Sequence, residues 1–150
     1  MEVLEILFAL SLDAFHSNHA VNFARLNQSE SDVIMAQTVY NKGSSILKMI
    51  EHLMGTENFR KALNYYLMKH QYSNAKIDDL LKAFDLFSYK PVRKIMNAWL
   101  KRRGYPMLKV RQNGNCYSLK QEKFSIDGVN NEEEKKMLWK IPMIYKSKMN

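Results

Sequence analysis

The spacing of the apolar residues changes once along this chain, and that change limits the folds that the chain can adopt. Up to residue 100, apolar residues recur three and four positions apart, which is the period of helices that bury one face. Over residues 107–126 they alternate with polar residues around Asn113-Gly114, a pattern typical of a β-hairpin. Gly104 and Pro106 separate the two patterns. The sequence therefore predicts a mainly α chain with a C-terminal β part.

Helix boundaries are marked by capping residues and helix breakers. Gly55 is placed to end one helix and to make a tight turn into a helical hairpin, and Thr56 is placed to cap the next helix. Tyr72 to Ala75 form a polar break, and Pro91 fits the first turn of the last helix. The apolar faces expected along the helices are Leu4, Leu7, Phe8, Leu12 and Phe15; Val39, Ile46, Leu47, Ile50, Leu53 and Met54; Phe59, Leu63, Tyr66 and Leu67; Ile77, Leu80, Leu81, Phe84 and Phe87; and Val92, Ile95, Met96, Trp99 and Leu100. Residues 16–32 are expected to form a loop.

The β part is expected to contain only a few strands. After the hairpin and the charged run Glu132 to Lys136, one further strand is expected from Leu138 to Tyr145. So small a sheet leaves edges exposed, and we expect the chain to self-associate through them. The first helix also begins without an N-cap. Both ends are therefore expected to be cuts through a larger unit.

Composition excludes several classes of protein. The chain has 150 residues, of which 46% are hydrophobic and 25% charged, so disorder and collagen are excluded. The single cysteine, Cys116, cannot form an internal disulfide, which favours the cytoplasm. The most apolar stretch, residues 3–15, carries Glu5 and Asp13 and is shorter than the roughly 20 residues that cross a membrane. No membrane partner or secretion signal is expected.

The net charge of +8 is unevenly distributed. Residues 1–41 carry one basic and five acidic side chains, whereas the remaining residues carry 22 basic and 10 acidic ones. Such asymmetry indicates either a nucleic-acid surface or an acidic partner that covers the basic part. The basic cluster comprises Arg93, Lys94, Lys101, Arg102, Arg103, Lys109 and Arg111. Because no nucleic-acid motif accompanies it and a helix end favours cations, a solvated helix end is the preferred interpretation, and nucleic acid is disfavoured.

The four histidines do not predict a metal site. His16 and His19 lie three positions apart in the expected loop without a third ligand nearby, and His52 and His70 belong to different helices. The chain contains neither H-E-x-x-H nor paired cysteines, and it has no glycine-rich phosphate loop. We therefore expect no metal-binding and no cofactor-binding residue in this chain.

The order of several short motifs resembles zinc-dependent aminopeptidases of the alanyl, puromycin-sensitive and tricorn-interacting-factor type. The segment from Tyr40 to Ile50 resembles the Y-x-K-G-A-x-x-L-x-M motif of that family. Other matching segments are Asp13 with Ser17-Asn18-His19-Ala20-Val21, Gly55 to Phe59 with Tyr66-Leu67, His70 to Ala75 with Asp79-Leu80, Trp99 with Gly104-Tyr105-Pro106 and Val110, and Trp139-Lys140-Ile141-Pro142. The agreement covers nearly the whole chain with its spacing kept.

The resemblance implies a fold and one catalytic residue. Residues 1–105 would be the C-terminal helical part of a thermolysin-like peptidase domain, and residues 106–150 would begin a β-sandwich domain. In this family the counterpart of Tyr40 stabilises the oxyanion of the tetrahedral intermediate, a role that suits a fixed phenol donor. Lys42 and Gly43 are expected to be structural. The family's zinc ligands and general base come from H-E-x-x-H and a further glutamate, which this chain lacks.

The resemblance therefore predicts a partial zinc aminopeptidase. We expect the chain to be inactive by itself, and to act on peptide substrates only when an N-terminal, zinc-bearing chain completes it. Met35-Ala36, in place of the family's Phe-Asp pair, and Ala20, in place of proline, are departures that indicate relaxed constraint. The alternative is a non-catalytic peptide- or protein-binding module derived from the same fold. A nucleic-acid binder is the third hypothesis.

Overall fold

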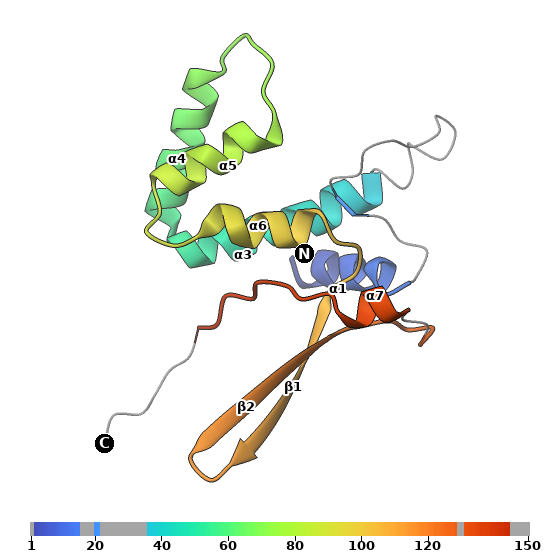
Figure 1. Cartoon of the computed structure of the whole chain (residues 1–150). Helices are drawn as coiled ribbons and strands as arrows, with labels where there is room; N and C mark the ends of the chain where they lie inside the picture. Colours follow the sequence, from blue (N-terminus) through green and yellow to red (C-terminus); the bar gives the residue numbers. More distant parts are fainter. Residues whose placement is uncertain (1, 16–19, 22–35, 129–130, 145–150) are drawn as a thin grey trace.

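A computed structural model describes residues 2–15, 20–21, 36–128 and 131–144 (Figure 1). The helical part consists of α1 (Glu2–Asp13), the π-helical turn η1 (Ala36–Lys42), α3 (Gly43–Met54), α4 (Thr56–Lys69), α5 (Ile77–Leu86) and α6 (Val92–Leu100). It is followed by β1 (Pro106–Asn113), β2 (Cys116–Lys123) and the short helix α7 (Glu132–Lys135). The predicted order of helices and hairpin is confirmed. The loop expected at residues 16–32 lies almost wholly outside the described residues.

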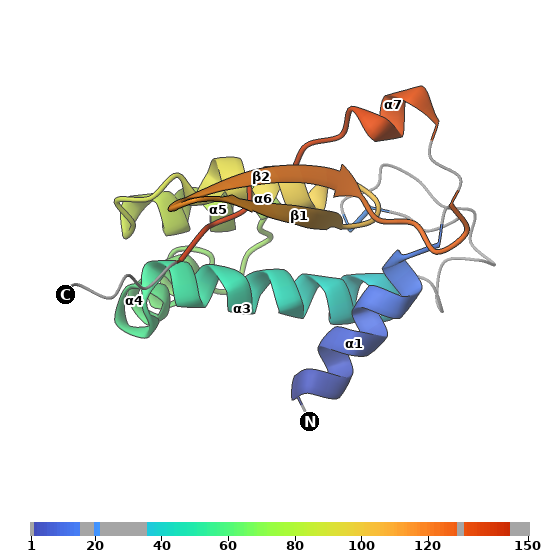
Figure 2. The same ribbon diagram turned by 90° about the horizontal axis from the view of Figure 1, so that it is seen from below.

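The core lies where α3, α4, α5 and α6 meet. Figures 1 and 2 show α6 lying along α3, and α4 beside α5. The spacing of apolar residues located most of the buried side chains of α3, α5 and α6, but Val39 of η1 and Ile77 of α5 are exposed. In α4, Leu67 is exposed and Ala62 is the residue that the helix buries. The face predicted for α1 is also wrong, because four of its residues are exposed: Leu4, Leu7, Phe8 and Phe15. The buried core comprises Ile46, Ile50, Leu53, Met54, Ala62, Leu81, Phe84, Val92, Ile95, Met96 and Leu100.

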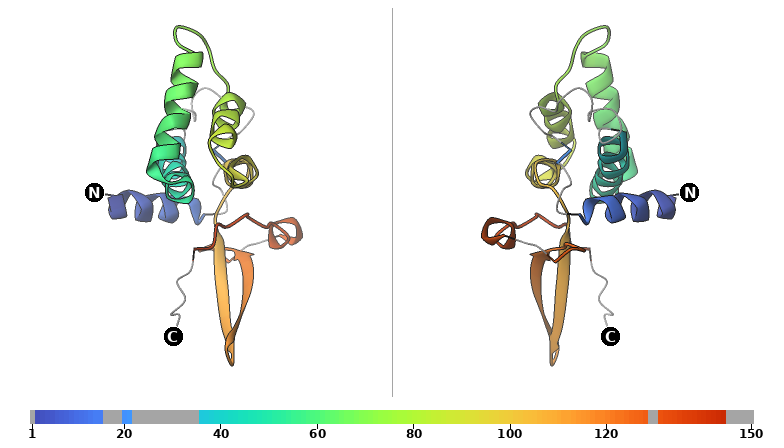
Figure 3. Two further views of the ribbon diagram at one scale, coloured as in Figure 1. Left: turned by 90° about the vertical axis from the view of Figure 1, so that its left-hand side faces the viewer. Right: turned by 90° about the vertical axis from the view of Figure 1, so that its right-hand side faces the viewer.

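The turn at Gly55 differs from the prediction in two ways. Gly55 ends α3 with a φ of 83°, as expected, but it also occupies the N-cap position of α4, so Thr56 is the first helical residue and not the cap. The prediction of a hairpin of α3 and α4 is also wrong, because α4 turns away from α3 and α5 folds back alongside α4 (Figures 1 and 3). Stacking of Phe59 on Phe84, with ring centroids 5.2 Å apart, helps to hold α4 against α5.

The structure confirms the β-hairpin that the alternating pattern predicted, formed by β1 and β2. The strands are antiparallel, with Pro106 opposite Lys123 and Asn113 opposite Cys116. The turn between them is Gly114-Asn115, and the φ of 60° at Gly114 favours glycine there. The hairpin projects from the helical part on the side opposite α4 and α5 (Figure 3).

The prediction of a strand from Leu138 to Tyr145 is wrong, because residues 138–144 belong to no strand. Tyr145 lies outside the described residues. The side chain of Gln121 on β2 makes the hydrogen bonds to this segment that a strand pairing would otherwise make. Trp139 N donates to Gln121 Oε1 (2.8 Å), and Gln121 Nε2 donates to Trp139 O (3.0 Å). Because Gln121 satisfies both main-chain groups of Trp139, the segment is held against β2 without forming a ladder.

Candidate functional site

Lys42, the last residue of η1, anchors the turn that carries the predicted catalytic tyrosine. Its side chain is buried, and Nζ lies 2.8 Å from Asp13 Oδ2. Nζ also donates to the carbonyl oxygens of Arg102 (2.9 Å) and Gly104 (3.0 Å). These contacts join the end of α1, the start of α3 and the turn after α6. The prediction that Lys42 is structural agrees with these contacts.

Asp13 and Gly104 complete this junction. The second carboxylate oxygen of Asp13 accepts from Gly104 N at 3.0 Å, so one side chain binds both a buried ammonium and a main-chain amide. Gly104 has a φ of 76°, and a Cβ added there would lie 2.7 Å from Lys123 Cε. Position 104 therefore requires glycine for both its conformation and its space.

Burial governs the electrostatics of the pair. It lowers the pKa of Lys42 from its ordinary value, while the Asp13 carboxylate opposes that shift. A buried cation is tolerated only where its protons find acceptors, and Nζ has one carboxylate and two carbonyls. The pair thus depends on a complete set of partners.

Tyr40 lies two residues before this anchor. Its side chain is 74% exposed, and its hydroxyl makes no hydrogen bond within the part of the chain that the structure describes. The following residue, Asn41, is held through its carbonyl oxygen, which accepts from the hydroxyls of Ser44 (3.0 Å) and Ser45 (2.8 Å). π-helical turns inside helices occur frequently at functional sites. The structure therefore presents an exposed phenol on a main chain that is fixed immediately after it.

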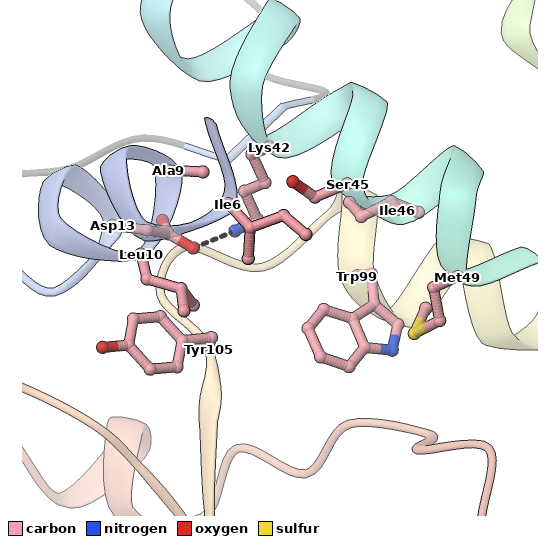
Figure 4. Close-up of a pocket in the computed structure, with 10 residues that line it drawn as sticks. All are labelled: Ile6, Ala9, Leu10, Asp13, Lys42, Ser45, Ile46, Met49, Trp99 and Tyr105. Atoms are coloured by element: carbon pink, nitrogen blue, oxygen red, sulfur yellow. Dashed lines mark ion pairs between the residues drawn. The ribbon is translucent and has the colours of Figure 1, made fainter. Parts of the chain in front are cut away.

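An apolar cavity of about 210 Å³ lies beside the Lys42–Asp13 pair (Figure 4). Figure 4 shows the ion pair at one end of the cavity and Trp99 with Met49 at the other. The lining residues are Ile6, Ala9, Leu10, Asp13, Lys42, Ser45, Ile46, Met49, Trp99 and Tyr105, so Tyr40 is not one of them. The cavity is bounded by α1, α3 and α6, and its walls suit apolar groups.

A second buried ion cluster joins the hairpin to α7. Lys123 Nζ lies 2.5 Å and Arg103 Nη2 3.0 Å from Oε1 of Glu134, which is fully buried. Glu134 also forms a capping box with Asn131, the N-cap of α7. Our sequence analysis missed this cluster and α7. The Asn131-x-x-Glu134 spacing was the signal that could have shown the start of the helix.

The described residues do not bring together a set of zinc ligands. In the described ranges, no group of three histidine, cysteine or acidic side chains is arranged to hold a metal ion. His52 lies on α3, as expected, and His70 is the C-cap residue just after α4, whereas His16 and His19 lie outside the described residues.

The basic cluster is divided among several contacts. Arg102 donates to the Ala98 carbonyl at the end of α6 (3.3 Å), a helix-end contact of the kind expected. Arg103 pairs with Glu134, and Lys109 Nζ lies 2.5 Å from Glu122.

Over the described residues, no helix is both long enough and apolar enough to span a membrane.

Comparison with known proteins defines the family to which the chain belongs. Residues 2–99 match the peptidase family M1 domain. The chain is 41% identical over 135 residues to tricorn protease-interacting factor F2 of Thermoplasma volcanium, covering 90% of this chain and 17% of that protein. It is 38% identical over 138 residues to alanine/arginine aminopeptidase of Saccharomyces cerevisiae, covering 92% and 16%, and 35% identical over 135 residues to aminopeptidase M1-D of Oryza sativa subsp. japonica, covering 90% and 15%.

The chain belongs to peptidase family M1, a family of metallopeptidases. It spans about a sixth of the length of the curated relatives that it matches. The expected division into residues 1–105 and 106–150 stays a prediction.

Proposed function

We propose that this chain supplies Tyr40 to the active site of an M1 aminopeptidase whose zinc ligands and general base come from another part of the domain. The observation that carries the proposal is the 74% exposed phenol, two residues from the buried anchor Lys42. A buried, three-partner ammonium fixes the main chain there, while nothing among the described residues occupies the hydroxyl. Tyr40 is thus free to meet a substrate.

The chemistry follows from the charge that peptide hydrolysis creates. When water adds to the scissile carbonyl, its oxygen becomes an oxyanion. The Tyr40 hydroxyl donates a hydrogen bond to that oxygen. This hydrogen bond is far stronger in the transition state than in the neutral substrate. A donor held in place beforehand requires no reorganisation when the charge appears. Losing one such donor typically lowers the rate about 100- to 1000-fold.

By itself the chain is proposed to be inactive. Its sequence contains no H-E-x-x-H motif, so the groups that would activate the attacking water in this family must come from elsewhere. Peptides with a free N-terminus are the proposed substrates of the completed domain. Support comes from the aminopeptidases among the relatives, including one whose name specifies alanine and arginine.

A chimeric enzyme tests the role of Tyr40 directly. The segment of the yeast alanine/arginine aminopeptidase that matches this chain over 138 residues is replaced by the corresponding residues of this chain. We expect the chimera to hydrolyse alanyl and arginyl anilides, and the Tyr40→Phe chimera to have a kcat about 100- to 1000-fold lower with little change in KM.

The matched control is Tyr89→Phe, which changes another exposed tyrosine, in the loop between α5 and α6. That chimera is expected to retain full activity. Unchanged kcat in the Tyr40→Phe chimera would remove Tyr40 from the active site. A folded chimera that binds peptides without hydrolysing them would instead favour the non-catalytic peptide-binding module.

A further inference from the structure

The charged side chains that are buried in the described part of the chain are linked to one another through Gly104. They are Asp13, Lys42, Lys123 and Glu134. Gly104 N donates to Asp13, and Gly104 O accepts from Lys42. A Cβ added at Gly104 would lie only 2.7 Å from Lys123 Cε, so the stem of Lys123 packs directly on this glycine. Two buried ion pairs therefore meet at one residue that has no side chain.

The pair of Lys123 and Glu134 ties α7 to the turn after α6. Oε1 of Glu134 contacts Lys123 Nζ and lies 3.0 Å from Arg103 Nη2, and Arg103 immediately precedes Gly104. Glu134 is itself fixed by the capping box at the start of α7. The same turn supplies the carbonyl oxygens of residues 102 and 104 to the ammonium of Lys42.

The two ion pairs also affect each other through their charges. Burial is the main cause that lowers the pKa of Lys42, and the positive charge of Lys123 lowers it further, so the two ammonium groups repel each other. The carboxylate of Glu134 neutralises Lys123 and limits that repulsion. Loss of the Glu134 charge would leave two buried cations close together, which the main chain around Gly104 can relieve only by moving.

Movement of this turn would reach Tyr40. The turn supplies two acceptors of Lys42, and Lys42 ends the π-helical turn that carries Tyr40. Because the Tyr40 side chain is 74% exposed, its direction is set mainly by the main chain beneath it. A misplacement of about 1 Å at a catalytic group can cost about 100-fold in rate.

We propose that Glu134 is a positioning residue for Tyr40. Its carboxylate holds Lys123 and Arg103, these side chains hold the turn after α6, and that turn holds Lys42 and the main chain of η1. The statement about catalysis rests on the proposed function, whereas the coupling between α7 and η1 does not. The exposed tyrosine thus depends on a buried carboxylate that follows the hairpin in the sequence.

Amide hydrogen exchange on the full 150-residue chain tests the coupling without any need for activity. In Glu134→Gln, we expect the amides of η1 to exchange at least about tenfold faster than in the wild type, because hydrogen bonds to a charged group are lost from the network. The amides of α5, which packs on α4 and α6, are the internal reference and should keep their exchange rates.

Glu132→Gln is the matched control, because Glu132 lies on α7 but is exposed and pairs with Lys135. It should leave exchange in η1 unchanged. Glutamine at position 134 can keep the capping box, and circular dichroism checks that the variant is folded. If it does not fold, Arg103→Ala carries the test with the same expected result, because Arg103 is partly exposed and links Glu134 to the turn. Faster exchange confined to α7, or equal acceleration in η1 and α5, overturns the proposal.

A double-mutant cycle in a chimera that includes α7 tests the positioning of Tyr40. Glu134→Gln is expected to lower kcat about 10- to 100-fold with little change in KM. Combined with Tyr40→Phe, it should lower kcat no further, because the hydroxyl that it positions has been removed. An unchanged kcat in Glu134→Gln, or a loss that multiplies the loss of Tyr40→Phe, overturns the positioning role. Faster exchange in η1 together with an unchanged kcat in Tyr40→Phe would refute the proposed function and leave the coupling between α7 and η1 standing.

Discussion

Lys42 shows how one side chain can determine the geometry of a neighbouring site. Its ammonium is buried with Asp13 and two carbonyls, and Tyr40 is exposed only two residues away. The carbonyls come from residues 102 and 104, which are far from Lys42 in the sequence. The orientation of the candidate catalytic turn therefore depends on the turn after α6.

Removing Lys42 is expected to destabilise the whole chain. Lys42→Ala leaves the Asp13 carboxylate buried without its cation, which typically costs about 3 to 5 kcal/mol of the free energy of unfolding. Urea denaturation measures this loss. The control Lys82→Ala breaks exposed pairs with Asp78 and Asp79 on α5 and should cost no more than about 1 kcal/mol. Equal losses in the two variants would contradict the structural role of Lys42.

At the scale of elements, α7 depends on Glu134 to remain docked on β2. Burial by itself would raise the pKa of Glu134, but the hydrogen bonds from Lys123 and the Asn131 amide, together with the positive charges of Lys123 and Arg103, outweigh it and hold the pKa below its ordinary value. The folded state therefore binds a proton at Glu134 more weakly than the unfolded state does. The stabilisation is fully present above the ordinary carboxyl pKa of about 4.3 and is lost as pH falls through the lower folded pKa.

The pH dependence of stability checks the role of Glu134. Between about pH 6 and about pH 3, the urea midpoint of the wild type should fall more steeply than that of Glu134→Gln, which has no carboxylate to protonate. Glu132→Gln, on the same helix but exposed and paired with Lys135, should follow the wild type. Parallel curves for wild type and Glu134→Gln would show that Glu134 contributes nothing to the acid sensitivity.

At the scale of the whole molecule, the hairpin leaves apolar side chains and strand edges in solvent. Leu108, Val110, Tyr117 and Leu119 lie on one face of the two-stranded sheet and are 36% to 65% exposed. Unpaired edges of this kind pair readily with another chain. We expect the isolated chain to elute from a sizing column as a dimer or larger species, and Val110→Lys to shift it toward the monomer.

The control for this experiment is Ser118→Lys, which adds the same charge to the opposite face of β2. It should leave the elution unchanged. A monomer at all accessible concentrations would contradict the prediction. An equal shift toward the monomer in Val110→Lys and Ser118→Lys would show that the added net charge, and not the loss of the apolar face, causes the effect.

The sequence by itself determined the features that depend on neighbouring residues. Helical spacing located the buried faces of α3, α5 and α6, and alternation around Asn113-Gly114 located the hairpin, because both patterns repeat within a few residues. The order of motifs also pointed to the M1 family, which the family match confirms. Tyr40 came from that resemblance alone, since a catalytic tyrosine and a surface tyrosine have the same local pattern.

Only the tertiary structure decided which distant segments meet. No local pattern shows that α4 would pair with α5 and not α3, or that Gln121 would take the place of a third strand. The buried pair of Lys42 with Asp13 is also hidden from the sequence, since charged residues are usually exposed. Burial of a charge is decided by partners supplied from elsewhere in the chain. The exposed apolar face of α1, formed by Leu4, Leu7 and Phe8, has the same cause, because helical spacing shows that a face is apolar but not what covers it.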